Sequence, residues 1–337
     1  MNLICICVKL TISFFIAIVF CSFFCYIYCN PPRTRLSLTG STGFVGIPGC
    51  FFSDWREGGS CGVTDKKGFR NLASVPYEEP GILLMGSSHM EAVNVSQNKS
   101  CSALINEKLP HTLVLFNIGQ SGNFFPDCTC WMRAAMSEFH PRKYVIIETP
   151  NIEFDNILLG RIASGQYRPV TKTFYSRNFV DVIQRIPLFR ALGKQFLTMK
   201  SQNALRDSHK ADPTVFPDYY PQLKSWLAQI ALCASEYHIV PIILYYSHFT
   251  FQRELGEQHY LTENPRALDY FREACEENGI KFIDMTEDFE RHFHETYEPA
   301  YGFINTAPGA GHLNKVGHRL IADRLYKEIM EMEGLAE

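Results

Sequence analysis

The sequence predicts an α/β fold built on a mainly parallel sheet. Beyond residue 80, short apolar runs alternate with segments whose apolar residues recur at helical spacing. Such alternation is typical of strands joined by helices that cover both faces of a parallel sheet. Gly, Ser and Asn follow several of the apolar runs, at the carboxyl ends of strands where sheets of this kind bind ligands.

Length and charge limit the classes of function. A chain of 337 residues is long enough for one large α/β domain with appendages. The formal net charge is −3 and the isoelectric point is about 6.4. These values give no indication of a polyanionic partner, so we expect no binding to nucleic acid.

The composition of the N-terminal segment differs most from that of an ordinary globular protein. Residues 10–29 carry no charge and form a run long enough to cross a bilayer. Because no small-residue cleavage site follows the run, we expect residues 1–30 to be a single-pass anchor rather than a cleaved signal peptide. Lys9 precedes the run while Arg33 and Arg35 follow it, so the positive-inside rule does not decide the orientation.

Residues 31–77 are rich in Gly, Pro and Ser and are predicted to be a linker with short strands or turns that folds back onto the main domain. Cys50 and Cys61 flank its Gly-rich part and could form a disulfide outside the cell. The pair Cys128 and Cys130 lacks a second pair at zinc-finger spacing, so no metal site is expected on these cysteines.

The main domain is expected to span residues 78–337. Its strand-like runs are Ile82–Met85, Thr112–Asn117, Tyr144–Glu148, Ile239–Tyr246 and Lys281–Asp284. Its helical patterns lie at about 98–108, 126–139, 220–237, 265–278 and 315–333. The alternation fails at about 155–220, which we interpret as a helical insertion. That insertion either shapes a substrate cleft or simply covers the sheet.

The segment Gly86-Ser87-Ser88 follows the first strand and precedes a helical pattern. Free N–H groups and the positive dipole end at a helix start favour developing negative charge. Ser88 is therefore a candidate nucleophile, provided that a base can reach it. The neighbouring His89 points away from Ser88 at a helix start, so we expect it to be structural or to face the substrate.

The candidate base is His312, in a Gly- and Pro-rich loop just before the amphipathic C-terminal helix. A loop at that sheet edge can place an imidazole beside Ser88, where it would take the serine proton and return it to the leaving group. The alternative is a helix-capping histidine with no chemical role.

Donors for a tetrahedral oxyanion are expected at the ends of the second and third strands. Gly119 offers a bare backbone N–H and Asn151 a side-chain amide, which are the donor types that an oxyanion hole uses. Asn123 competes with Asn151 because it follows Gly119 closely. Gly and Asn also end many strands as plain turn formers.

The order Ser88, Gly119, Asn151, His312 resembles the SGNH (GDSL-like) hydrolase superfamily, with Ser87 where that family usually has Asp. The sequence His-Leu-Asn-x-x-Gly-His that begins at His312 resembles the last block of the family. The resemblance implies a three-layer α/β/α, flavodoxin-like fold with a five-stranded parallel sheet.

The resemblance also implies ester hydrolysis or O-acyl transfer without a cofactor. The N-terminus is most similar to membrane-anchored members that act on the cell envelope. From these we expect an acylated carbohydrate or other ester as substrate, an extracytoplasmic catalytic domain, and a membrane acyltransferase as a further partner.

One departure from the family concerns the acid of the triad. The family usually has Asp three residues before the catalytic histidine, and here that residue is Gly309. A backbone carbonyl of residues 307–309 could orient His312 in a Ser–His dyad, which is the account we favour. Asp284 or Glu148 could instead supply a carboxylate. The third account is an inactive module that binds a glycan or an acyltransferase partner.

Overall fold

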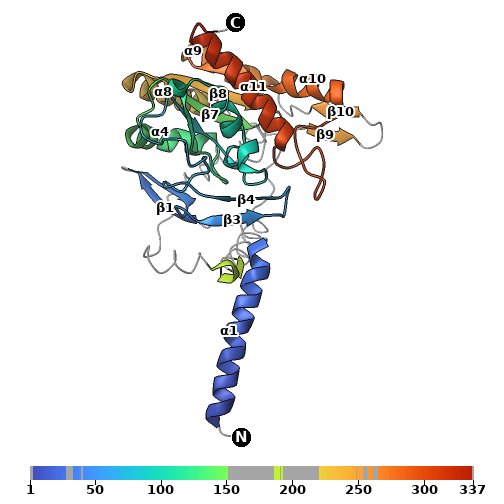
Figure 1. Ribbon diagram of the computed structural model, residues 1–337. Coiled ribbons are helices and arrows are strands. Elements are labelled where there is room, and N and C mark those ends of the chain that lie inside the picture. The colour runs from blue at the N-terminus through green and yellow to red at the C-terminus, as the bar shows by residue number, and fades with distance from the viewer. Residues whose placement is uncertain are drawn as a thin grey trace.

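The computed structural model describes residues 3–27, 33–38, 41–150, 186–189, 191–192, 220–247, 249–252, 257–260 and 265–335. A five-stranded sheet with entirely parallel pairing forms the centre of the molecule (Figure 1). Its strands are β5 (Ile82–Met85), β6 (Leu115–Asn117), β7 (Tyr144–Pro150), β8 (Val240–Tyr246) and β11 (Lys281–Asp284). Numbered along the chain, the spatial order is 2-1-3-4-5, the flavodoxin-like order. The predicted fold class is confirmed.

Helices cover both faces of the sheet, and the alternation of side chains along each strand explains how. In β5, Leu83 and Met85 belong to one hydrophobic cluster, whereas Ile82 and Leu84 belong to the other. The first cluster includes residues of α4 (Phe125–Phe139), α8 (Tyr220–Glu236) and α9 (Pro265–Glu277). The second includes residues of α3 (Cys101–Asn106), α10 (Thr286–Thr296) and α11 (Lys315–Met332). The three-layer arrangement follows from these two clusters.

Some element boundaries differ from the sequence-based expectation. The second strand begins at Leu115 rather than Thr112, because His111–Leu113 form a 3₁₀ turn. An antiparallel hairpin of β9 (Phe249–Gln252) and β10 (Glu257–Tyr260) follows β8 and was not predicted. The helical insertion expected at about 155–220 lies almost entirely outside the described residues.

The N-terminal helix α1 spans Leu3–Ile27. Its segment Ile4–Cys25 is long and apolar enough to cross a membrane, and none of it is buried within the protein. A signal sequence near an N-terminus meets the same criteria of length and composition. Figure 1 shows α1 projecting away from the sheet domain.

Two antiparallel hairpins follow α1 in the chain. The first pairs β1 (Arg33–Leu38) with β2 (Ser41–Gly46), and the second pairs β3 (Phe51–Asp54) with β4 (Ser60–Val63). Figure 1 shows the second hairpin between α1 and the sheet domain. In its register Cys61 lies opposite Ser53, and Cys50 pairs its backbone with Thr64, so both thiols are free. The suggested disulfide is therefore wrong.

His318 lies in the first turn of α11 and is completely buried. Its Nδ1 accepts a hydrogen bond from the Cys101 N–H at 3.3 Å, while Nε2 has no partner in the part of the chain that the structure describes. Burial, with the positive charges of Arg70 and His312, lowers the pKa of His318 from 6.5 to about 3. The folded protein therefore keeps this imidazole neutral.

This depressed pKa predicts a loss of stability in acid. Between pH 6.5 and pH 3 the unfolded chain binds a proton at His318 that the folded chain does not, so lowering the pH favours unfolding. This group should contribute up to about 1.4 kcal/mol for each pH unit in that window. Unfolding of the full chain in detergent at pH 4.5 and 6.5 should show a smaller pH dependence for His318→Gln than for wild type. Parallel pH dependences would contradict the prediction.

Candidate active site

The nucleophile candidate lies at a tight turn between β5 and α2 (Ser88–Glu91). Ser87 caps α2 by accepting a hydrogen bond from the His89 N–H at 3.2 Å. Gly86 has to be glycine here, because a Cβ would lie 2.6 Å from Glu148 Oε2 and 2.6 Å from Met90 Cγ. Ser88 is thereby presented as the first residue of the helix, at the carboxyl end of its strand.

Ser88 and His312 meet across the sheet edge, as the sequence predicted. The Nε2 atom of His312 lies 2.9 Å from Ser88 Oγ, within hydrogen-bonding range. His89 supports this contact rather than competing for it. Its Nδ1 accepts a hydrogen bond from the Leu313 N–H at 3.2 Å, and its buried ring packs 5.1 Å from the ring of His312. His89 is thus structural.

A third residue, which the sequence analysis missed, completes the arrangement. Glu57 Oε2 lies 2.5 Å from His312 Nδ1, and Glu57 Oε1 accepts a hydrogen bond from the His312 N–H at 2.7 Å. Burial raises the pKa of Glu57, but hydrogen bonds from His312 and the charges of His312 and Arg56 outweigh burial, and the net pKa is lowered. The carboxylate is therefore ionised at neutral pH and is aimed at the ring nitrogen that faces away from Ser88.

Gly311 makes room for this carboxylate. Its φ is +93°, and a Cβ would lie 2.3 Å from Glu57 Oε1. A side chain at this position would be strained by the backbone and would displace the carboxylate. The glycine before His312 is therefore part of the geometry that allows Glu57 to approach.

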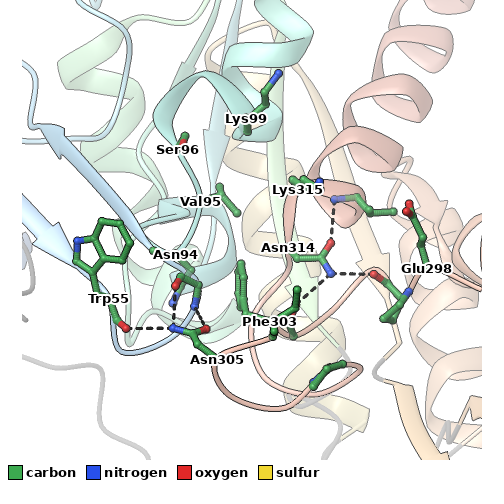
Figure 2. Close-up of a pocket in the computed structure, with 17 residues that line it drawn as sticks. Trp55, Asn94, Val95, Ser96, Lys99, Glu298, Phe303, Asn305, Asn314 and Lys315 are labelled. Atoms are coloured by element: carbon green, nitrogen blue, oxygen red, sulfur yellow. Dashed lines mark hydrogen bonds between the residues drawn. The ribbon is translucent and has the colours of Figure 1, made fainter.

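Two asparagines hold the loop that carries Glu57, which connects β3 to β4. Asn305 Oδ1 accepts from the Gly58 N–H at 2.9 Å, and its Nδ2 donates to the carbonyls of Gly58 at 2.8 Å and Trp55 at 3.1 Å. Asn94 Nδ2 donates to the Glu57 carbonyl at 3.1 Å. Figure 2 shows Asn94, Asn305 and Trp55 gathered at this loop. The backbone on both sides of Glu57 is thus held by contacts from distant parts of the chain.

The carboxylates considered from the sequence have other partners. Asp284 pairs with Arg272 at 3.1 Å and accepts from the Thr286 N–H at 2.9 Å. Glu148 is buried beneath the nucleophile turn and accepts from the Ser87 N–H at 2.6 Å, from Ser87 Oγ at 3.0 Å and from the Tyr246 hydroxyl. Burial raises the pKa of Glu148 despite these hydrogen bonds. Glu148 therefore supports the turn.

The expected Ser–His dyad, with His312 oriented by a backbone carbonyl, is not what the structure shows. Gly309 adopts φ of +83°, and its N–H donates to the Tyr301 carbonyl at 2.9 Å. Because Glu57 occupies the Nδ1 side of His312, no carbonyl of residues 307–309 is needed there. The partner of His312 is a carboxylate, and it comes from the segment interpreted as a linker.

The expected oxyanion donors need one correction. The Gly119 N–H, one of the predicted donors, donates to Asn117 Oδ1 at 2.8 Å and is therefore used within its own loop. Asn151 lies outside the described residues. Asn123 Nδ2, the competing donor, is buried and has no hydrogen-bond partner among the residues that the structure describes.

Backbone contacts hold the Asn123 loop beside the nucleophile turn. The Gln120 N–H donates to the Gly86 carbonyl at 2.9 Å, and the Asn123 N–H donates to the Gln120 carbonyl at 3.1 Å. The side-chain amide of Gln120 is a second buried donor without a partner in the described part of the chain. Unused amide donors thus lie on the loop next to Ser88.

Comparisons with protein-family models and with curated proteins give no match. Solved structures that resemble this chain include a psychrotrophic esterase from Pseudoalteromonas at 13% identity and a TM-score of 0.42, covering 75% of this chain and 98% of that one. An acetyl xylan esterase has 13% identity, a TM-score of 0.42 and coverages of 74% and 98%. A lipolytic G-D-S-L family member from Veillonella parvula has 11% identity, a TM-score of 0.35 and coverages of 72% and 94%. Similarity this distant transfers neither an activity nor a substrate.

The chain's own topology and site are more informative. The parallel strands follow the 2-1-3-4-5 order, with Ser88 after the first strand and His312 just before the last helix. The domain has a three-layer α/β/α fold with flavodoxin-like strand order. Within this domain the Asn314 side chain caps α11 through the Val316 N–H at 2.8 Å, and Gly317 allows the Ala300 carbonyl to approach closely. The last motif block thereby holds the loop of His312.

Proposed function

We propose that this chain is an SGNH-type serine hydrolase or O-acyltransferase with a Ser88–His312–Glu57 triad. The observation that carries the proposal is the continuous contact from Ser88 Oγ to His312 Nε2 at 2.9 Å and from His312 Nδ1 to Glu57 at 2.5 Å. Nucleophile, base and orienting carboxylate are recognised by this geometry and not by their order in the chain.

Each residue has a defined task in the proposed reaction. His312 takes the Ser88 proton as Oγ attacks the acyl carbon, and Glu57 keeps the proton on Nδ1 and stabilises the imidazolium. Cleavage of the ester bond releases the alcohol, which takes the proton from His312, and leaves an acyl-serine. In hydrolysis, water then attacks the acyl-serine. In acyl transfer, a sugar hydroxyl attacks it instead. In both reactions His312 takes the proton of the attacking hydroxyl and returns it to Ser88 Oγ.

The oxyanion is assigned to the Ser88 N–H and the Asn123 amide. Supporting this assignment, the Asn123 amide is buried without a partner among the described residues and lies on the loop anchored to Gly86. A donor preorganised for the transition state is worth about 10²–10³-fold in kcat. The first candidate from the sequence, Asn151, lies outside the described residues.

Asn123→Ala should lower kcat for p-nitrophenyl acetate by about 10²–10³-fold with little change in KM, because the lost hydrogen bond acts mainly in the transition state. Asn98→Ala, at an exposed position of the 3₁₀ turn Gln97–Lys99, is the matched control and should resemble wild type. An Asn123→Ala protein with unchanged kcat would remove Asn123 from the oxyanion site.

The test of the proposal is covalent labelling of the full chain. A small fluorophosphonate should modify wild-type protein, and peptide mapping should place the adduct on Ser88. Ser88→Ala should not be labelled. If folded wild-type protein reacts at another residue or not at all, the proposed nucleophile is wrong.

For the substrate we propose acyl esters of cell-envelope or extracellular carbohydrate. The proposal is supported by the N-terminal helix, which would anchor an extracytoplasmic domain in the membrane, and by the resemblance of the motif blocks to anchored family members. A membrane acyltransferase that supplies the acyl group is the partner that fits such a role. The alternative of an inactive binding module rested on a missing acid, and the Glu57–His312 contact removes that support.

A further inference from the structure

A cavity lies beside the proposed triad. Its volume is about 660 Å³, within the range of small-molecule sites (Figure 2). Its walls come from the β3–β4 loop, the segment after α2, the loop before α11 and the first turn of α11. None of the three triad residues lines it, although Trp55 and Gly58 on either side of Glu57 do. The cavity is therefore separate from the ester-cleaving centre.

The lining is apolar at its mouth as well as inside. Trp55, Val95, Phe303 and Pro308 contribute apolar surface, and the side chain of Ile304 at the mouth is 98% exposed. Trp55 is 49% exposed. Large apolar side chains grouped around a cavity and left open to solvent indicate a binding site rather than a structural core.

The polar groups of the walls are largely in use. Asn305 binds the Gly58 N–H and the Gly58 and Trp55 carbonyls, and Asn94 binds the Glu57 carbonyl. Asn314 caps α11 and donates to the Pro299 carbonyl at 2.8 Å. A sugar would need many free hydrogen-bonding groups, which these amides do not provide. An alkyl chain needs none.

The charged residues of the lining favour an anionic head group. Lys99 and Lys315 are exposed, and neither forms an ion pair with any residue that the structure describes. Glu298 is the acidic residue of the lining. Figure 2 shows Lys315 and Glu298 on the side of Asn314, and Lys99 above Val95 and Ser96. Two ammonium groups against one carboxylate leave an excess of positive charge.

We propose that this cavity binds a single-chain anionic amphiphile, with the alkyl chain against Trp55, Phe303 and Ile304 and the anionic head near Lys99 and Lys315. A fatty carboxylate and a lysophosphatidate share this chemistry. The proposal does not depend on catalysis, so binding is measured in the Ser88→Ala protein, where failure of the hydrolase proposal has no effect on the result.

The experiment uses the full Ser88→Ala chain in phosphatidylcholine nanodiscs with a diazirine-bearing palmitate and mass spectrometry of the cross-linked peptides. Cross-links are expected at residues 302–305 and Trp55 and should be competed by palmitate or lysophosphatidate. Adding Ile304→Asp should lower the yield at least tenfold. Leu232→Asp, at a 58% exposed position of α8 outside the cavity, is the matched control and should not lower it.

Competition with different head groups tests the charge. Palmitate or lysophosphatidate should compete at lower concentration than hexadecylamine or an alkyl glucoside, and the stronger of the two anions identifies the source of the head group. Lys99→Glu with Lys315→Glu should abolish this preference. Cross-links confined to α1, a yield unaffected by Ile304→Asp, or equal competition by the amine and the glucoside would each overturn the proposal.

Discussion

Glu57→Gln is expected to lower kcat/KM for p-nitrophenyl acetate by about 10⁴-fold, the effect of losing a triad carboxylate that nothing replaces. The carboxylate holds His312 with its proton on Nδ1, leaving Nε2 free to accept the Ser88 proton. A glutamine amide can donate to Nδ1 instead, which favours the wrong tautomer, and it carries no charge to stabilise the imidazolium.

The measurement is hydrolysis of p-nitrophenyl acetate by the full chain at neutral pH, where the lowered pKa of Glu57 keeps the carboxylate ionised. Glu331→Gln, at a partly exposed position near the C-terminal end of α11, is the control and should leave the rate unchanged. A Glu57→Gln protein within tenfold of wild type would indicate that His312 needs no carboxylate and acts in a dyad.

Gly311→Ala should reproduce much of this loss without touching an ionisable group. The added Cβ would lie 2.3 Å from Glu57 Oε1, so the carboxylate has to move away from His312. Gly334→Ala is the matched control, because Gly334 shares a positive φ (+68°) but has nothing within 4 Å of a Cβ. Gly311→Ala added to Glu57→Gln should have little further effect on kcat/KM. A large additional loss would mean that the glycine acts elsewhere.

Ser88→Ala and His312→Ala should each lower kcat by about 10⁶-fold, the scale seen when a nucleophile or its base is removed from a triad that acts as a unit. Without Oγ no acyl-enzyme forms, and without the imidazole the Ser88 hydroxyl loses the base that lies 2.9 Å from it. Both variants should retain only the residual rate that binding and oxyanion donors provide.

The effects of these substitutions on kcat should not be additive. Ser88→Ala combined with Glu57→Gln should be no slower than Ser88→Ala alone, because Glu57 acts only through His312 and Ser88. Rates are compared with the same ester, and folding is checked by circular dichroism. A Ser88→Ala protein with wild-type kcat would refute the role of Ser88, and additive losses would refute the coupling to Glu57.

The source of the acid has a consequence for any shortened protein. Glu57 lies on the β3–β4 loop, 255 residues before His312 in the chain and outside the boundaries predicted for the catalytic domain. A fragment that begins at residue 78 would keep Ser88 and His312 but lose the carboxylate. The segment between the N-terminal helix and the sheet domain is therefore part of the proposed active site.

The sequence alone was sufficient for the parts of the site that carry local signals. Fully apolar strands and amphipathic helices leave their periodicity in consecutive residues, so the alternation around the sheet could be recognised. Ser88 and His312 each lie in a short block where Gly, Asn or helix-start residues surround the functional side chain. Parallel strands end at one sheet edge, and for this reason the meeting of these two side chains could be predicted.

Only the tertiary structure decided what surrounds them. Glu57 faces His312 because Asn305 and Asn94, both distant in sequence, hold its loop and because Gly311 leaves space. The Gly119 N–H donates to Asn117 Oδ1, and this contact depends on the orientation of the Asn117 side chain. Contacts of this kind depend on where separate segments of the chain lie after folding. The residues that flank a contact residue in the sequence do not indicate which distant residue it contacts.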